Sequence, residues 1–102
     1  MEVDGIRGSI RYGYNVKVDT NKWVLKAVLD THKLLRWSGD ISGTGLKELS
    51  DIFLVGRLLN VDLVTDAGKV YSGAVYLTRL VGDKDGDGFE ASFSGTGILN
   101  MK

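Results

Sequence analysis

The sequence predicts a mainly β fold, an antiparallel β-sandwich or barrel of about six strands with one short α-helix packed outside. Two observations lead to this prediction. Apolar and polar residues alternate along most of the chain, as in half-buried strands, and only one segment shows helical spacing. Turn-forming residues, including 14 glycines in a chain of 102 residues, separate the alternating stretches. The length fits one domain that spans residues 1–102.

Three strands are predicted before the helix. Residues 9–19 alternate without interruption, and residues 19–22 supply a hairpin loop that is rich in turn formers. Residues 23–30 form the returning strand, and residues 34–42 form the third strand after a turn at 31–33. The apolar face of the first strand holds Ile10, Tyr12, Tyr14, Val16 and Val18.

The only predicted helix covers residues 46–55. Its apolar residues recur at helical spacing, Thr44 is placed to cap its first turn, and Gly56 is placed to end it. These apolar residues are Leu46, Leu49, Ile52 and Phe53.

Three more strands follow the helix, at residues 57–65, 70–81 and 89–99. The strands at 9–19 and 70–81 exceed the common strand length of about five to six residues. The chain contains no proline, a residue that keeps edge strands from pairing with other chains. Long strands without proline suit a protein whose strand edges pair with another subunit.

The composition excludes several classes of protein. The chain has no cysteine, which rules out disulfide scaffolds, thiolate zinc sites and cysteine nucleophiles. It carries 13 basic and 13 acidic side chains, so it lacks the positive charge of a general nucleic-acid binder. No apolar stretch approaches the ~18 residues of a membrane span. We therefore expect no membrane association.

One acidic loop matches the start of a calcium-binding motif. Asp83, Asp85 and Asp87 place carboxylates at the first three ligand positions. The later positions fail, because Glu90 stands where an apolar residue belongs and Ser94 stands where a bidentate glutamate belongs. The three aspartates are a weak calcium candidate, and a solvated hairpin loop is the favoured interpretation. Beyond this candidate we expect no metal and no cofactor.

Nothing in the sequence points to an enzyme. His32 is the only histidine and lies in a predicted turn, so no second histidine completes a metal site or a catalytic triad. Tyr12, Tyr14 and Trp23 could form a stacking platform for bases or sugars, or the core face of a hairpin. The absence of net positive charge favours the core or an interface.

The second half of the chain resembles the major tail tube proteins of long-tailed phages. The resemblance begins in a tryptophan-bearing strand and continues through the helix to the last strand, over about two thirds of the chain. The matching stretches are LRWSGDIS (35–42), LSDIF (49–53), LNVDL (59–63), GKVYSGAVYLTRL (68–80) and ASFSGTGIL (91–99). The match over residues 1–34 is poor, and members of this family are usually longer.

The resemblance implies a structural virion protein without enzymatic activity. Such subunits form hexameric rings, the rings stack into a tube around the tape-measure protein, and other tail proteins bind the tube. The DNA later passes through without specific binding. The implied location is the phage tail, after assembly in the host cytoplasm. The alternatives are another tail or head–tail joining protein of the same fold, or a monomeric β-sandwich binding module.

In this family the long strands pair across subunits, so the resemblance makes the two long strands the expected self-assembly surface. The expected residues are Tyr12, Tyr14, Val16, Lys17, Tyr71, Val75, Leu77 and Arg79. Charge is also uneven along the chain. Residues 1–36 hold seven basic and four acidic side chains, whereas residues 37–68 hold two and five. We therefore expect these two segments to face each other between stacked rings.

Overall fold

The computed structural model describes residues 1–32, 35–54, 56–82 and 86–102. These residues form an antiparallel β structure with one short helix, which confirms the predicted fold class. In chain order the elements are β1 (Glu2–Gly5), β2 (Arg7–Tyr12), β3 (Val16–Leu29), β4 (Leu35–Thr44), α1 (Leu46–Leu54), β5 (Leu59–Val64), β6 (Val70–Gly82), β7 (Gly88–Gly95) and β8 (Asn100–Met101).

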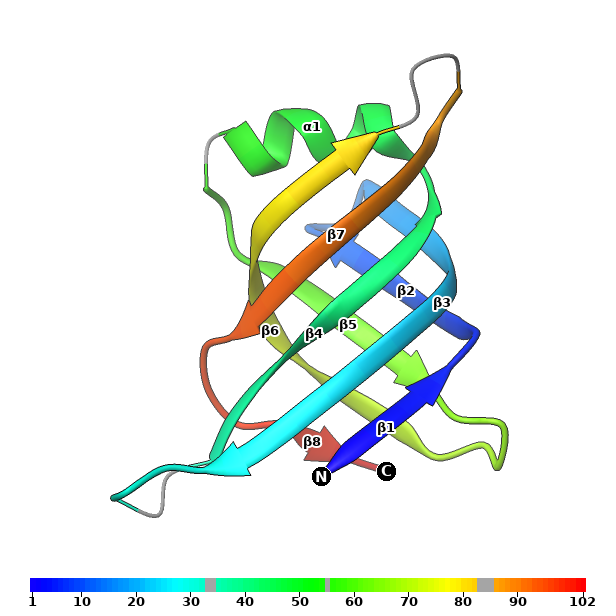
Figure 1. Cartoon of the computed structure of the whole chain (residues 1–102). Coiled ribbons are helices and arrows are strands. Elements are labelled where there is room, and N and C mark those ends of the chain that lie inside the picture. The colour runs from blue at the N-terminus through cyan, green and yellow to red at the C-terminus, as the bar shows by residue number, and fades with distance from the viewer. Residues whose placement is uncertain (33–34, 55, 83–85) are drawn as a thin grey trace.

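The sheet closes on itself into a barrel. β3 pairs with β1 and β2 along one edge and with β4 along the other. β4 then pairs with β7, β7 with β6, β6 with β5, and β5 with β2. Two three-stranded units, β2–β3–β4 and β5–β6–β7, thus meet along two seams, and the chain crosses from one to the other through α1 (Figure 1).

The predicted strand at 9–19 is wrong in one respect, because it is the two arms of a hairpin. β2 ends at Tyr12, residues 13–15 form the turn with Gly13 at a φ of 60°, and β3 begins at Val16. The loop predicted at 19–22 lies inside β3, where the pairing with β4 shifts between Thr20 and Lys22. That shift marks a β-bulge, which absorbs the turn-forming residues without ending the strand.

Helix α1 lies across one end of the barrel (Figure 1) and buries Leu49 and Ile52. The predicted cap at Thr44 is wrong. The loop before β7 caps the helix instead, because the Asp87 carbonyl accepts hydrogen bonds from the amides of Gly45 (2.8 Å) and Leu46 (3.0 Å). The Asp87 carboxylate also accepts a hydrogen bond from the Lys47 amide, at 3.2 Å. These bonds satisfy amides that a helix leaves unpaired at its start.

The core fills the inside of the barrel and contains both tryptophans. The Trp23 indole nitrogen donates a hydrogen bond to the Arg7 carbonyl at 2.7 Å, so this polar atom is satisfied despite its burial. Trp37 and Phe93 form an edge-to-face pair with ring centroids 6.3 Å apart. The largest fully buried side chains are those of Trp23, Phe93, Ile10, Leu25, Leu49, Leu59, Leu63, Val61 and Val75.

The last predicted strand, 89–99, is too long at its carboxyl end. β7 ends at Gly95, and residues 96–99 then turn away from β4 before β8 pairs with the start of β6. The two termini lie close together at the end of the barrel away from α1 (Figure 1), and the terminal amine of Met1 donates to the Ala27 carbonyl. Among the described residues, no helix has the length and apolar character needed to cross a membrane.

Candidate assembly surface

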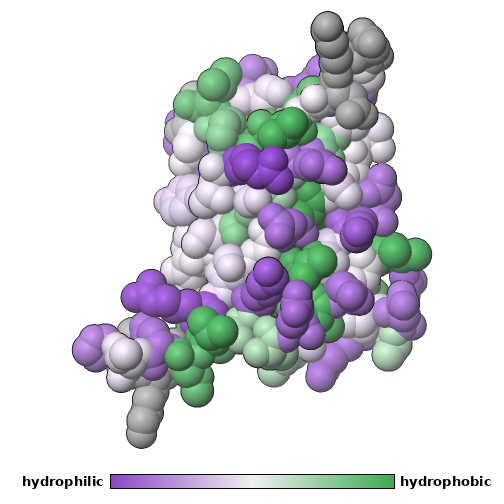
Figure 2. All heavy atoms as spheres, viewed as in Figure 1, coloured by the Kyte–Doolittle hydropathy of each residue, from purple (hydrophilic) through white to green (hydrophobic). Residues whose placement is uncertain are grey.

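Large apolar side chains are exposed at the end of the barrel that is remote from α1. We name this surface the open-end patch, and its residues are Met1, Val28, Leu29, Leu35, Ile98 and Met101. Ile98 is 81% exposed and Val28 is 62% exposed. Figure 2 shows apolar surface at the lower left, where β3 and β4 end in the same view. An apolar cluster of this kind on a small protein marks a surface that binds another protein or membrane.

The patch borders a groove that forms where β4 and β7 diverge. β4 and β7 pair only as far as Ser38 and Ser94, and the following residues of β7 and its extension diverge from the start of β4. The resulting groove has a volume of about 880 Å³ and contains Leu35, Trp37 and Ile98 in its lining. A second hollow of about 470 Å³ continues it and shares Val28, Leu35 and Leu99 with it.

The floor of the groove is held rigidly. The Trp37 indole donates a hydrogen bond to the Gly97 carbonyl at 2.8 Å, which ties the start of β4 to the extension beyond β7. Thr96 is fixed in turn, because its amide and hydroxyl both donate to the Ala74 carbonyl, at 3.0 and 3.1 Å. The groove is therefore preformed, and a partner would lose little free energy in ordering it.

Basic side chains border this apolar groove. Lys26 and Arg36 both contribute to its lining and are exposed. Arg36 forms an ion pair with Asp30 at 3.0 Å, yet its side chain remains 74% exposed. The groove can thus bind a partner that combines apolar side chains with carboxylates.

The eight residues expected to mediate assembly are divided between the interior and the surface. Tyr71 and Val75 lie in the core of this barrel, and Tyr12, Val16 and Leu77 are partly buried against that core. Tyr14, Lys17 and Arg79 are exposed. Tyr14 stands at the tip of the β2–β3 hairpin, where its side chain is completely exposed.

The long strand β6 has an open edge over its second half. β6 pairs with β5 only as far as Val75, so residues 76–82 pair with β7 on one side alone. The last residue of this stretch, Gly82, packs against Leu46 of α1. The other long strand, β3, pairs with β2 or β1 at residues 16–19 and 23–26 and with β4 at Thr20 and residues 22–29, so only residues 23–26 have partners on both edges. The unpaired stretch of β6 is longer than those of β3, because it runs without interruption over residues 76–82.

The aromatic stacking platform is not assembled. Trp23 is 1% exposed inside the barrel, whereas Tyr14 projects into solvent from the hairpin tip. Tyr12 pairs with Val16 across the hairpin and is partly buried. The three rings therefore present no shared exposed face for a base or a sugar.

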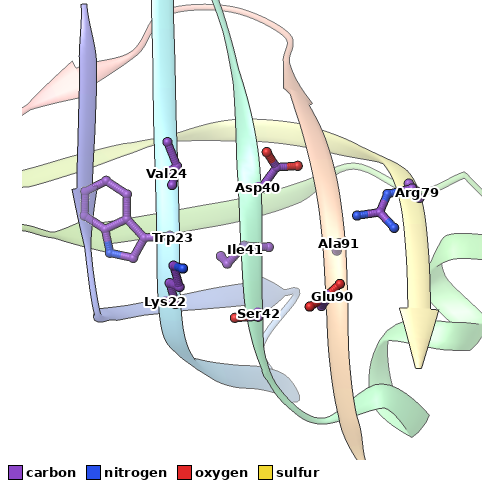
Figure 3. Close-up of a pocket in the computed structure, with 9 residues that line it drawn as sticks. All are labelled: Lys22, Trp23, Val24, Asp40, Ile41, Ser42, Arg79, Glu90 and Ala91. Atoms are coloured by element: carbon purple, nitrogen blue, oxygen red, sulfur yellow. The ribbon is translucent and has the colours of Figure 1, made fainter. Parts of the chain in front are cut away.

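A shallow pocket on the outer face of the barrel is polar (Figure 3). It measures about 290 Å³ and is lined partly by Asp40 of β4, Glu90 of β7 and Arg79 of β6. Ser92 donates a hydrogen bond to Asp40 at 2.7 Å and accepts one from Arg79 at 3.4 Å. These groups satisfy one another's hydrogen bonds on the sheet face.

Asp87, one of the three candidate calcium ligands, has a different role in the fold. Asp87 caps α1 through its carbonyl and its carboxylate, as described above. Asp83 and Asp85 lie outside the described residues. Within the part of the chain that the structure describes, no group of three or more acidic, histidine or cysteine side chains is placed to hold a metal ion.

Comparisons of this chain with protein-family models, with curated proteins and with solved structures found no match.

Proposed function

We propose that this protein is a structural, self-assembling subunit of the tail tube type that its second half resembles. The observation that carries the proposal is the open-end patch, since six large apolar side chains gather at one end of a small barrel. Their exposure to water is unfavourable, and burial against another subunit recovers about 25 cal/mol per Å² of apolar area. In this proposal the subunit has no enzymatic activity and uses no cofactor.

The assembly follows the plan that the resemblance implies. Subunits form hexameric rings, the rings stack around the tape-measure protein in the phage tail, and DNA passes through the lumen without specific binding. The open edge of β6 beyond Val75 supports lateral pairing, and Leu77 and Arg79 of the expected set lie on this stretch. The equal number of basic and acidic side chains suits a channel in which DNA slides.

A monomeric binding module is the rival function, and two observations weigh against it. The aromatic platform that it would use is not assembled, because Trp23 is buried. Its calcium-dependent form would use Asp87, which already caps α1. Another tail or head–tail joining protein of the same fold would also assemble with copies of itself. The shape of the assembly therefore distinguishes such a protein from a tube subunit.

Electron microscopy and light scattering of the purified protein over a wide range of concentration test the proposal. We expect rings or tubes, and a mass that rises in multiples of the 11.1 kDa subunit. Ile98→Asp should weaken this assembly by placing a charge in the open-end patch. Asn60→Asp adds the same charge at an exposed position of β5 and serves as the control. A protein that stays monomeric at the highest concentrations would overturn the proposal.

A further inference from the structure

Helix α1 carries an acidic and apolar stripe on its exposed side. Glu48, Asp51 and Leu54 are three residues apart in the sequence, so they share one face of the helix. All three are exposed, and Leu54 is 80% exposed. Lys47, also exposed, lies four residues before Asp51 and partly offsets its charge, whereas the last turn of the helix contains no basic residue. Leu58, also exposed, follows shortly after the helix.

The groove at the other end of the barrel presents the opposite charge. Val28 and Arg36 are partners across β3 and β4, and Lys26 lies two residues before Val28, so all three point to the outer face. Together with Ile98 they form an apolar surface with two cationic side chains at its border. The charges and the apolar side chains of this surface match those of the helix stripe.

The two surfaces lie at opposite ends of one strand. β4 begins at Leu35 beside the groove and ends at Thr44, and α1 starts two residues later. A ten-residue strand spans roughly 30 Å at 3.3 Å per residue. Figure 1 shows the same arrangement, with α1 at the top and the end of β3 and the start of β4 at the bottom. One molecule cannot bring its own stripe to its own groove.

We propose that the α1 stripe of one copy docks in the open-end groove of the next copy. Glu48 and Asp51 then face Lys26 and Arg36, and Leu54 packs on the apolar side chains of the groove. The inference rests on the proposed function and identifies the end-to-end contact of its assembly. Because the two surfaces differ, the contact is heterologous, and repeating it gives an open row of subunits.

Charge selects this arrangement over symmetric ones. Two grooves placed face to face would bring Lys26 and Arg36 of one copy against the same residues of the other. Two helices placed face to face would do the same with Glu48 and Asp51. Juxtaposed like charges are unfavourable, whereas the stripe-to-groove contact pairs unlike charges. It also buries both sets of exposed apolar side chains at once.

Two blocking variants test the contact by light scattering and sedimentation. Leu54→Asp blocks only the stripe, and Ile98→Asp blocks only the groove. Each change is at an exposed position, and circular dichroism checks that each variant is folded. We expect each variant alone to form no end-to-end contact, because every such contact needs one stripe and one groove, so assembly through the β6 edge should stop at single rings. An equimolar mixture should restore one end-to-end contact and grow no further in that direction, through the intact stripe of one variant and the intact groove of the other.

A charge exchange provides a second test that leaves the apolar side chains in place. Lys26→Glu and Glu48→Lys should each weaken association at low salt by about tenfold or more, and the double variant should recover it. Raised salt should reduce association of the wild-type protein, because exposed charge pairs are screened. Failure of the double variant to recover association would exclude the pairing of these two ends.

The outcomes separate this inference from the proposed function. Stacked rings or tubes that Leu54→Asp forms as readily as the wild-type protein would overturn the stripe-to-groove contact and leave the tube function standing. A 1:1 dimer in the mixture, with no rings or tubes from the wild-type protein, would support the contact and contradict the tube function. A wild-type protein that remains monomeric would overturn both.

Discussion

The indole of Trp37 occupies the space that a side chain at Gly95 would need. A Cβ atom added to Gly95 would overlap the Trp37 ring, and one added to Gly73 would come within 2.7 Å of it. Trp37, Gly73 and Gly95 belong to three separate stretches of the sequence. The barrel brings them together under the open-end groove, which gives these glycines a packing role.

Gly95→Ala should therefore destabilise the protein by about 1–3 kcal/mol, the range found for overpacked cores. The added methyl group forces Trp37 to move and breaks its hydrogen bond to Gly97. Chemical denaturation measures the change in the free energy of unfolding. Gly97→Ala is the matched control, because a Cβ atom at Gly97 meets nothing within 4 Å. Equal stability of the two variants would contradict the packing described here.

Two glycines with positive φ should respond differently to asparagine. Gly45 has a φ of 130°, and a Cβ atom there would come within 2.8 Å of the Val18 side chain. Gly56 has a φ of 63°, in the left-handed region that asparagine tolerates, and a Cβ atom there has open space. We expect Gly45→Asn to lower the free energy of unfolding by about 2 kcal/mol or more. Gly56→Asn should change it by less than about 1 kcal/mol, and the reverse order would be inconsistent with the structure.

Asp87→Ala should destabilise the protein by about 1 kcal/mol, the usual effect of removing a helix cap. The change deletes the acceptor for the Lys47 amide and leaves the backbone bonds of residue 87 in place. Asp87→Asn should retain most of the stability, since asparagine caps helices as well as aspartate does. Asp66→Ala removes the same charge from another turn and is the control. A loss of stability in Asp87→Asn as large as that in Asp87→Ala would argue against the cap.

Calcium should leave the thermal unfolding midpoint unchanged at millimolar concentration. An ion that binds only the folded protein stabilises it by RT ln(1 + c/Kd), where c is the free ion concentration, and Asp87 already binds the start of α1. Thermal unfolding in calcium, in magnesium and in a chelator measures the effect. A midpoint that rises in calcium but not in magnesium would restore the loop as a calcium site.

The pattern of the sequence predicts the strands better than it predicts the first turn. The β2–β3 hairpin has a three-residue turn, so Ile10 pairs with Val18 and Tyr12 pairs with Val16. Residues of the same parity therefore face the same side in both arms, and the apolar alternation continues through the turn at Tyr14. A hairpin of this kind cannot be distinguished from one long strand by its period. The turn formers at 19–22 strengthen the wrong interpretation, because a β-bulge can hold the same residues.

The candidate surface was harder to predict for a different reason. Alternation identifies two faces of a strand but does not say which face lies inside the barrel, so the expected assembly set combines Tyr71 and Val75, which lie in the core, with exposed residues. The residues of the open-end patch come from both termini and from the ends of β3 and β4. Only the closure of the barrel brings these residues together, and no local pattern in the sequence predicts that closure.

Closure of the barrel also has a consequence for folding kinetics. The pairs β2–β3 and β5–β6 join neighbouring segments, so they require only short loops to close. The two seams, β2–β5 and β4–β7, join residues that are far apart in the chain, such as Arg7 with Val64 and Ser38 with Ser94. Long loops lose more entropy on closing, and folding slows as such contacts come to dominate. The slowest step is therefore the meeting of the two three-stranded units, and until it is complete the subunit exposes four unpaired strand edges to its neighbours.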